Sequence, residues 1–400
     1  MATNFDYSNI ETTNAEPDAS SMIETFRAIG YSIEAAIADI IDNSITADAK
    51  NIWVDYVWHG PHTVLSILDD GKGMNSEELI QAMRPGSKNP LLTRDSNDLG
   101  RFGLGLKTAS FSQTRKFSVI SKRTDCEVCL WSWDLDYVNK SQSWNIIKYC
   151  PEESNYSEKM EQLKSGTCVV WWDLDRVTKD TKEDSEESKK KFLETMERVK
   201  SHLSMVFHMF IDDGVNIFLQ GRRIEPWDPF MIGFSGLQPK PEVKFQGDQI
   251  NIKGFVLPHR SKLSYEEYNY GKGPKDSWTE QQGFYVYRSK RLLVAGDWLS
   301  MFKKEVHYDL CRIRIDLPNN VDEDWQIDIK KSIARPPLKY KDQIRSVAKE
   351  VRAQALEVYT NKGQILKRKL SKDEYSPFWE ERVRHGKRFY KINREHPLLS

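Results

Sequence analysis

Residues 32–44 constrain the fold most, because this stretch is apolar on one side and carries carboxylates and amides on the other. Its four isoleucines recur at spacings of three and four, which predicts a helix with a buried stripe. Asp39 and Asn43 are four apart and project from one side, with Cβ atoms about 5–6 Å apart. The helix is therefore either an ordinary amphipathic one or a place where Asp39 holds a water and Asn43 holds Mg²⁺.

A second polar motif follows a predicted strand. Residues 51–58 and 63–68 alternate as strands, and the second runs directly into Asp69-Asp70-Gly71-Lys72-Gly73-Met74. Two glycines two apart permit a close backbone approach. Asp69, at the strand end, is placed to accept a hydrogen bond from a ligand amino group. A surface turn explains this motif equally well when it is taken alone.

A long polar loop precedes a glycine-rich segment. Residues 84–99 show almost no periodicity, which is typical of a lid or binding loop in a compact domain. The next residues, 100–108, place three glycines before a helix, so backbone N–H groups and Lys107 could bind phosphate oxygens. The spacing excludes a P-loop, because Leu106 separates the last glycine from Lys107. The segment is a phosphate loop of another type, or a flexible hinge.

The rest of the chain predicts further strands at 116–122, 126–133, 144–149 and 166–173, and long helices at 186–207 and 339–359. Four hundred residues exceed one hydrophobic core, so we expect two domains. Residues 1–21 are expected to be a flexible N-terminal arm, 22–208 the first domain, and 209–360 an α+β second domain. Residues 361–400 form a basic segment that stops without a closing element, so the chain could be part of a longer protein.

Composition narrows the class of protein. Lys and Arg number 59 and so do Asp and Glu, so the chain has no overall excess of positive charge that would indicate nucleic-acid binding. From Lys339 onward there are 16 basic and 8 acidic residues, which fits either a solvated helix face or a nucleic-acid contact. Five scattered cysteines argue against a disulfide framework. No apolar run reaches the ~18 residues of a membrane helix, so we expect a cytoplasmic protein without a membrane partner.

The order of these motifs resembles the ATP-binding domain shared by gyrase, the 90-kilodalton heat-shock chaperone, histidine kinases and MutL, the GHKL or Bergerat fold. The resemblance covers about residues 22–210 and implies helices over one mixed or antiparallel sheet. Its four elements are the Asp39/Asn43 helix, Asp69-x-Gly71-x-Gly73, Gly100-x-x-Gly103-x-Gly105-x-Lys107, and Gly166-Thr167 on a strand.

The resemblance implies roles for individual residues. Asn43 would bind Mg²⁺, and Asp69 would accept from the adenine amino group with help from Thr167. Gly73 would let the base approach, and residues 84–106 would form the ATP lid. The wider ATP site would include Gly71, Met74, Ser87, Lys88, Gly100, Arg101, Phe102, Gly103, Leu104, Gly105, Leu106, Lys107 and Thr108.

Asp39 stands where ATPase members of the family usually carry a glutamate as general base. Aspartate is one methylene shorter, and a misplacement of about an ångström can cost about a hundredfold in rate. Thr46, where many members have an aspartate, is a second departure. Asp39 is therefore expected to be a catalytic base for slow hydrolysis.

Residues from about 211 to 360 resemble the ribosomal-S5-like α+β transducer domain of gyrase, MutL and MORC proteins. In that group a transducer lysine reaches the γ-phosphate, and Lys330 and Lys331 are the candidates. The whole chain looks most like bacterial relatives of MORC ATPases. This implies a slow Mg²⁺-dependent ATPase that forms a homodimeric clamp on ATP binding and acts on DNA or an effector protein, in phage defence or DNA maintenance. The alternatives are a nucleotide-gated scaffold with little hydrolysis, or a DNA-binding protein with vestigial ATPase motifs.

Overall fold

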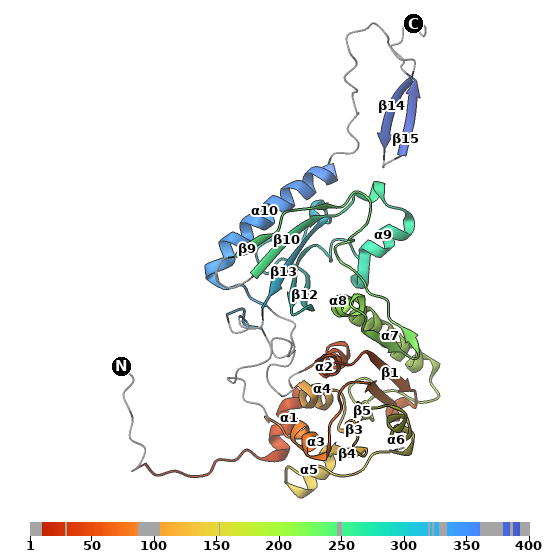
Figure 1. Ribbon diagram of the computed structural model, residues 1–400, viewed down its shortest axis with the longest axis vertical. Helices are drawn as coiled ribbons and strands as arrows, with labels where there is room; N and C mark the ends of the chain where they lie inside the picture. Colours follow the sequence, from red (N-terminus) through yellow and green to blue (C-terminus); the bar gives the residue numbers. More distant parts are fainter. Residues whose placement is uncertain are drawn as a thin grey trace. The chain divides into compact units, whose positions relative to one another are not determined.

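The computed structural model describes residues 10–28, 30–86, 105–151, 153–245, 250–318, 321, 324–327, 334–360, 379–384 and 387–392 (Figure 1). They divide into two compact units. The first comprises the described parts of Met1–Ile40, Val54–Lys88 and Gly103–Phe192, and the second those of Ile41–Trp53 and Leu193–Ser400. The units part inside a long helix near Phe192, before the boundary at 208 that the sequence predicts.

Helices and one sheet build the first unit. Its helices are α1 (Ala19–Ala28), α2 (Ile33–Thr46, which continues into the second unit), the short η1 (Gly60–His62), α3 (Ser76–Met83), α4 (Gly105–Gln113), α5 (Leu135–Ser141) and α6 (Glu153–Gln162). Its strands are β1 (Asn51–Val57, shared in the same way), β2 (Val64–Asp69), β3 (Lys116–Lys122), β4 (Cys129–Asp134) and β5 (Gly166–Trp172).

Strand β5 lies inside this sheet, between β3 and β2, and pairs antiparallel with both. Side chains alternate between the faces of a strand. Cys168, Val170 and Trp172 therefore pack in a core cluster that includes Tyr156 and Met160 of α6. On the other face, the indole of Trp171 donates to Ser110 of α4 at 2.9 Å. Figure 1 shows α6 on one side of the sheet and α1, α3 and α4 on the other.

The second unit contains the greater part of α7 (Glu186–Val206, which begins in the first unit) and the helices α8 (His208–Asp212), η2 (Arg260–Lys262), α9 (Tyr265–Lys272), η3 (Gly273–Lys275), η4 (Val306–Tyr308) and α10 (Leu338–Thr360). Its strands are β6 (Asn216–Leu219), β7 (Arg222–Arg223), β8 (Gln238–Pro239), β9 (Val243–Phe245), β10 (Ile250–Val256), β11 (Gly283–Arg288), β12 (Arg291–Asp297), β13 (Cys311–Leu317), β14 (Trp379–Arg384) and β15 (Lys387–Ile392).

A mixed sheet organises the second unit, with order β12-β11-β13-β10-β8 and β9 paired to β10. Strand β11 pairs parallel with β13 and antiparallel with β12. Helix α10 packs against β10, where a Cβ added to Gly254 would lie 2.3 Å from Cγ2 of Val351. This contact explains a glycine inside a strand. Strands β14 and β15 form a separate antiparallel hairpin within the basic segment.

The α+β class expected from the sequence is confirmed by these helices and sheets. The predicted helices at 186–207 and 339–359 correspond to α7 and α10. The predicted strand at 144–149 is wrong, because there only Ile147 makes an isolated bridge, to Ser132. Within the described residues, no helix has both the length and the apolar character needed to cross a bilayer.

Candidate nucleotide-binding site

Strand β2 ends at Asp69, whose buried carboxyl lies under the loop that follows. The backbone N–H of Gly71 donates to its Oδ1 at 2.9 Å. Asp69 is directly opposite Thr167 in the antiparallel register of β2 and β5. Directly opposite residues place their side chains on one face, with Cβ atoms about 4.5–5.5 Å apart. The fold thus brings together two residues that are separated by almost a hundred positions in the sequence.

Ser121 of β3 completes this corner, although sequence reasoning missed it. Its fully buried hydroxyl lies 2.9 Å from Oγ1 of Thr167 and 2.9 Å from the carbonyl oxygen of Gly166. It also accepts a hydrogen bond from the backbone N–H of Met74 at 2.9 Å. A hydroxyl has one proton and two acceptor lone pairs, so it can make all three contacts at once. The signal in the sequence is a serine at the end of the predicted strand 116–122, next to the apolar Val119 and Ile120.

Two glycines let the backbones of this corner approach closely. A Cβ on Gly73 would lie 1.8 Å from the carbonyl oxygen of Lys122, and its φ of +64° also favours glycine. A Cβ on Gly166 would lie 2.1 Å from the carbonyl oxygen of Asp69. Gly73 therefore has a packing reason to be glycine besides the predicted one of admitting a base.

Asp39 lies on α2 with 3% of its surface exposed, and the hydroxyl of Tyr31 donates to its Oδ2 at 3.0 Å. The same Oδ2 would be 3.9 Å from a Cβ on Gly105, the first residue of α4. The carboxyl therefore lies beside the first turn of α4, where helix N–H groups create a positive end. Asn43, one turn later on α2, is exposed.

Lys107 is buried in the first turns of α4, with 2% of its surface exposed. Its ammonium donates to the carbonyl oxygen of Ala82 in α3 at 2.9 Å. In this structure the lysine therefore ties α4 to α3. Thr108, which follows it, is also buried, whereas Leu106 is half-buried. The predicted contact of Lys107 with phosphate remains a prediction.

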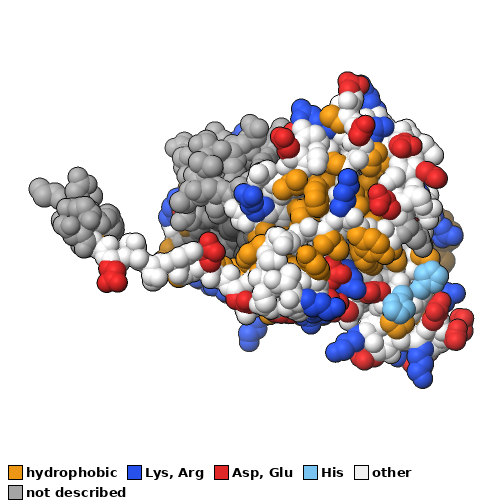
Figure 2. Space-filling model, turned by 90° about the horizontal axis from the view of Figure 1, so that it is seen from below, with side chains coloured by type: hydrophobic (Ala, Val, Ile, Leu, Met, Phe, Trp, Pro, Cys, Tyr) orange, Lys and Arg blue, Asp and Glu red, His pale blue; other side chains and the backbone are white. Residues whose placement is uncertain are grey.

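The first residues of the predicted lid, Arg84, Pro85 and Gly86, line a largely apolar pocket of about 670 Å³ beside α1, α3 and β4. Its other walls include Met22, Phe26, Met83, Trp133 and Trp144. Figure 2, which views the molecule from below, shows apolar side chains gathered in the middle of that face and charged ones around them.

Several predicted site residues lie outside the described residues. They are Ser87, Lys88, Gly100, Arg101, Phe102, Gly103, Leu104, Lys330 and Lys331. The predicted site residues that the structure does describe fall into two groups, one around Asp69 and the other around Asp39.

Residues 31–167 match a protein family described as "Histidine kinase-, DNA gyrase B-, and HSP90-like ATPase". The match begins at Tyr31, which contacts Asp39, and ends at Thr167, which faces Asp69. Residues 31–167 belong to this GHKL family.

Relatives of this GHKL domain include MORC and MutL proteins. The chain is 33% identical to "ATPase morc-1" of Caenorhabditis elegans over 89 residues, which is 22% of this chain and 10% of that protein. It is 23% identical to "MORC family CW-type zinc finger protein 3" of Mus musculus over 186 residues, 39% of this chain and 20% of that protein. "DNA mismatch repair protein MutL" of Dictyoglomus turgidum is 32% identical over 90 residues, 22% of this chain and 16% of that protein. The similarity thus spans a fifth or less of each relative, and it relates this GHKL ATPase domain to MORC proteins.

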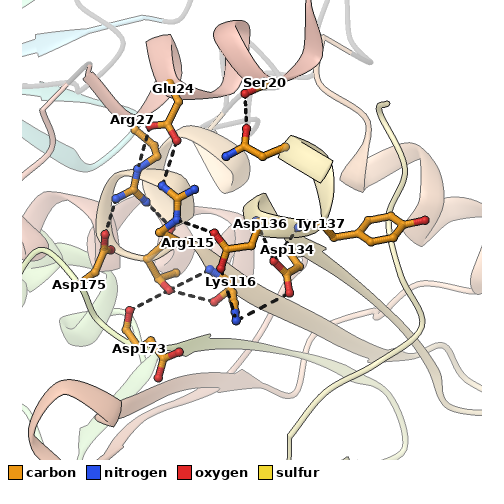
Figure 3. Close-up of polar contacts among 12 residues, drawn as sticks. Ser20, Glu24, Arg27, Arg115, Lys116, Asp134, Asp136, Tyr137, Asp173 and Asp175 are labelled. Atoms are coloured by element: carbon orange, nitrogen blue, oxygen red, sulfur yellow. Dashed lines mark hydrogen bonds and ion pairs between the residues drawn. The ribbon is translucent and has the colours of Figure 1, made fainter. Parts of the chain in front are cut away.

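The far end of α4 in the GHKL domain is held by Arg27 (Figure 3). Its Nη1 donates to the carbonyl oxygens of Phe111 at 2.8 Å and Thr114 at 2.7 Å, and its Nη2 pairs with Asp175 at 2.5 Å. A buried cation at a helix C-terminus satisfies the last carbonyls and complements the helix dipole. Arg27 thereby anchors the helix whose other end lies beside Asp39.

A second arginine strengthens this anchor. Arg115 pairs with Glu24 of α1 at 2.9 Å and with Asp136 of α5 at 3.1 Å (Figure 3). These pairs are partly exposed, so each contributes little alone. Together they join α1 and α5 to the residues that follow α4.

Proposed function

We propose that this chain binds ATP with Mg²⁺ and hydrolyses it slowly to ADP and phosphate. The observation that carries the proposal is the buried carboxyl of Asp39 beside Gly105, at the N-terminal end of α4. A helix N-terminus binds phosphate oxygens, and a neighbouring carboxylate can accept a proton from an attacking water. Membership of residues 31–167 in a family of ATPases supports the same reading.

The adenine end of the nucleotide would bind at Asp69. A carboxylate can accept several hydrogen bonds, so Asp69 would accept from the amino group of adenine as well as from the N–H of Gly71. The hydroxyl of Thr167, 2.9 Å from Ser121, would donate to or accept from the base or a bridging water. The loop from Gly71 to Met74 would form the wall beside the base.

The chemistry of Asn43 fits a magnesium ion. Its exposed side chain offers a hard amide oxygen, and Mg²⁺ takes one or two protein oxygens together with phosphate oxygens and water. When bound, the ion would neutralise charge on the phosphates and polarise the transferred group. Asn43 would hold it from the same helix that carries Asp39.

Hydrolysis would use Asp39 as the base. The oxygen of a water attacks the γ-phosphorus, the bond to the bridging β–γ oxygen breaks with its electron pair going to ADP, and Asp39 accepts the proton of the water. The hydrogen bond from Tyr31 would fix the orientation of the carboxyl. Because aspartate is shorter than the glutamate usual in the family, the reaction is expected to be slow.

We also propose that ATP binding joins two copies of the chain into a clamp that acts on DNA or on a partner protein, in phage defence or DNA maintenance. The names of the relatives, a DNA mismatch repair protein and MORC ATPases, support this. Residues 209–360 would serve as the transducer, with Lys330 or Lys331 reaching the γ-phosphate. The described part of this region is an α+β fold with α10 on its sheet.

A nucleotide-gated scaffold with little hydrolysis is the second candidate. It is favoured by the short side chain of Asp39 and by the hydrogen bond that already engages its Oδ2. In this case the clamp would open when ATP dissociates.

Phosphate release and ATP binding by the purified chain test these proposals. The wild type is expected to release phosphate only with Mg²⁺, and Asp39→Ala to lose about a hundredfold or more in rate while still binding ATP. Asp69→Asn is expected to lose ATP binding, because an amide presents a donor where the adenine amino group needs an acceptor. Equal rates for wild type, Asp39→Ala and Asp39→Glu would exclude Asp39 as the base. ATP binding without hydrolysis in all of them would favour the scaffold.

A further inference from the structure

A buried ion pair is formed by helix α2, close to the two residues of this helix that are proposed to act on the nucleotide, Asp39 and Asn43. Nε of Arg291 lies 2.9 Å from Oδ1 of Asp42, and their side chains are only 6% and 1% exposed. Asp42 belongs to α2 and Arg291 is the first residue of β12. The two residues are 249 positions apart in the sequence. None of the roles assigned above to α2 accounts for this pair.

Arg291 is held rigidly on its own side. It follows the two-residue turn Ser289-Lys290 between β11 and β12, where φ is +47° and +70°, the pattern of a tight hairpin turn. Its Nη1 donates to the carbonyl oxygen of Leu292 at 2.6 Å. Its guanidinium lies 4.8 Å from the ring centre of Phe207. The arginine therefore presents its Nε to Asp42 from a fixed position.

The position of Asp42 determines where its neighbours point. Successive residues are about 100° apart around a helix, and Asp42 directly precedes Asn43 and follows Asp39 by three residues. A rotation of α2 by about 20° would move a side-chain oxygen some 5–6 Å from the helix axis by roughly 2 Å. A shift of about 1 Å can cost a hundredfold in rate. Fixing Asp42 therefore fixes the direction of both functional side chains.

We infer that Arg291 is a positioning residue for the nucleotide site: through Asp42 it sets the rotation of α2, and so places Asn43 for Mg²⁺ and Asp39 for the attacking water. This inference rests on the proposed ATPase function. It gives the β11–β12 hairpin a role in nucleotide chemistry, although neither strand supplies a residue to the site.

The test compares Arg291→Gln, Arg291→Lys and Asp42→Asn with the matched control Lys290→Gln. Lys290 belongs to the same hairpin and pairs with Asp213 at 2.6 Å, but both side chains are more than half exposed. The double variant Asp42→Asn/Arg291→Gln removes both buried charges, so neither is left buried without its partner. It can therefore be measured even where a single variant fails to fold. All measurements use the full chain at a temperature at which thermal unfolding shows each variant to be folded.

The readout is the Mg²⁺ concentration that gives half-maximal binding of a non-hydrolysable ATP analogue, beside the rate of phosphate release. We expect Arg291→Gln, Asp42→Asn and the double variant to need about tenfold more Mg²⁺ and to hydrolyse ATP at least tenfold more slowly. Binding of the analogue without Mg²⁺, which depends on the Asp69 end, should change less than twofold. Arg291→Lys should be intermediate, and Lys290→Gln should match the wild type.

A purely structural role would lower thermal stability while leaving the Mg²⁺ dependence unchanged, and that result would overturn the inference. An equal loss of binding with and without Mg²⁺ would overturn it as well, because it would indicate general damage to the site. If the wild type itself does not bind the analogue, the proposed ATPase function is overturned instead. The wild-type measurement therefore separates this failure from a failure of the inference about Arg291.

Discussion

The hydroxyl of Tyr31 donates a hydrogen bond to Oδ2 of Asp39 at 3.0 Å, and both residues are buried. The same oxygen faces the first turn of α4. A carboxyl held on one side by a phenol and placed beside a helix N-terminus has little rotational freedom. Tyr31 therefore fixes the orientation of the Asp39 carboxyl in this structure.

Replacing Tyr31 by Phe tests this arrangement. The aromatic ring remains, and the hydrogen bond from the phenol to the Asp39 carboxyl is lost. A hydrogen bond to a carboxylate is worth about 1.5–3 kcal/mol. We expect phosphate release to slow by about tenfold or more while ATP affinity stays within twofold, as measured by single-turnover kinetics and equilibrium binding. Unchanged hydrolysis would show that Tyr31 does not orient the base.

Gly73→Ala should damage the domain far more than Gly86→Ala. Both glycines have positive φ, +64° and +68°, so each alanine carries a backbone cost of about 1–2 kcal/mol. Only at Gly73 would the new Cβ also meet another atom, the carbonyl oxygen of Lys122 at 1.8 Å, whereas nothing lies within 4 Å at Gly86. We expect Gly73→Ala to lose about 3 kcal/mol or more of unfolding free energy, measured in urea. Similar losses in the two variants would contradict this packing.

Ser121→Ala is expected to weaken ATP binding, because it removes the contact with Thr167 and leaves the N–H of Met74 without its acceptor. Ser118→Ala is the control on the same strand: its buried hydroxyl contacts Ser132 and Trp172 instead. Both changes should cost about 1–3 kcal/mol of stability. Only Ser121→Ala should lower ATP affinity, by about fivefold or more in isothermal titration; equal affinities would remove Ser121 from the site.

His208 should make the second unit sensitive to acid. Burial, with a smaller contribution from Arg314, lowers the pKa of its imidazole from 6.5 to about 4. The unfolded chain therefore binds a proton between pH 6.5 and 4 that the folded state refuses, so stability falls as pH falls through this window. The loss approaches about 3 kcal/mol at pH 4.

The measurement for His208 is the unfolding free energy of wild type and His208→Gln between pH 7 and 4. Glutamine can keep a hydrogen bond to the hydroxyl of Tyr287, which lies 2.8 Å from Nε2 of the histidine. The difference between the two proteins should grow in favour of the variant as pH falls. Parallel pH profiles would show that His208 is protonated in the folded state.

Much of the site could be predicted because its residues occur in short motifs with local meaning. The periodicity of residues 32–44 predicts Asp39 and Asn43 on one helix, and the alternation of residues 63–68 predicts Asp69 at the end of a strand. The role of Ser121 could not be found in this way. It depends on β3 pairing with β5, and a hydroxyl inside an apolar strand does not reveal which strand will lie beside it.

The same limit applies to Asp42 and to residues 144–149. A carboxylate on an amphipathic helix is expected from the sequence to face solvent. In the structure Asp42 is instead buried in an ion pair with Arg291, which is far away in the sequence. Residues 144–149 alternate like a strand, but only Ile147 finds a bridging partner, in Ser132. Local alternation predicts the capacity to pair, whereas the partner is decided by the packing of the whole unit.

At Gly73 and Gly166 the backbones at the ends of β2, β3 and β5 approach one another closely. The shape of that corner is therefore determined mainly by peptide groups, whose geometry is the same in every protein. Most side chains around it are free to differ without altering the outline. This freedom fits the 23–33% identity between this chain and its relatives over the aligned residues.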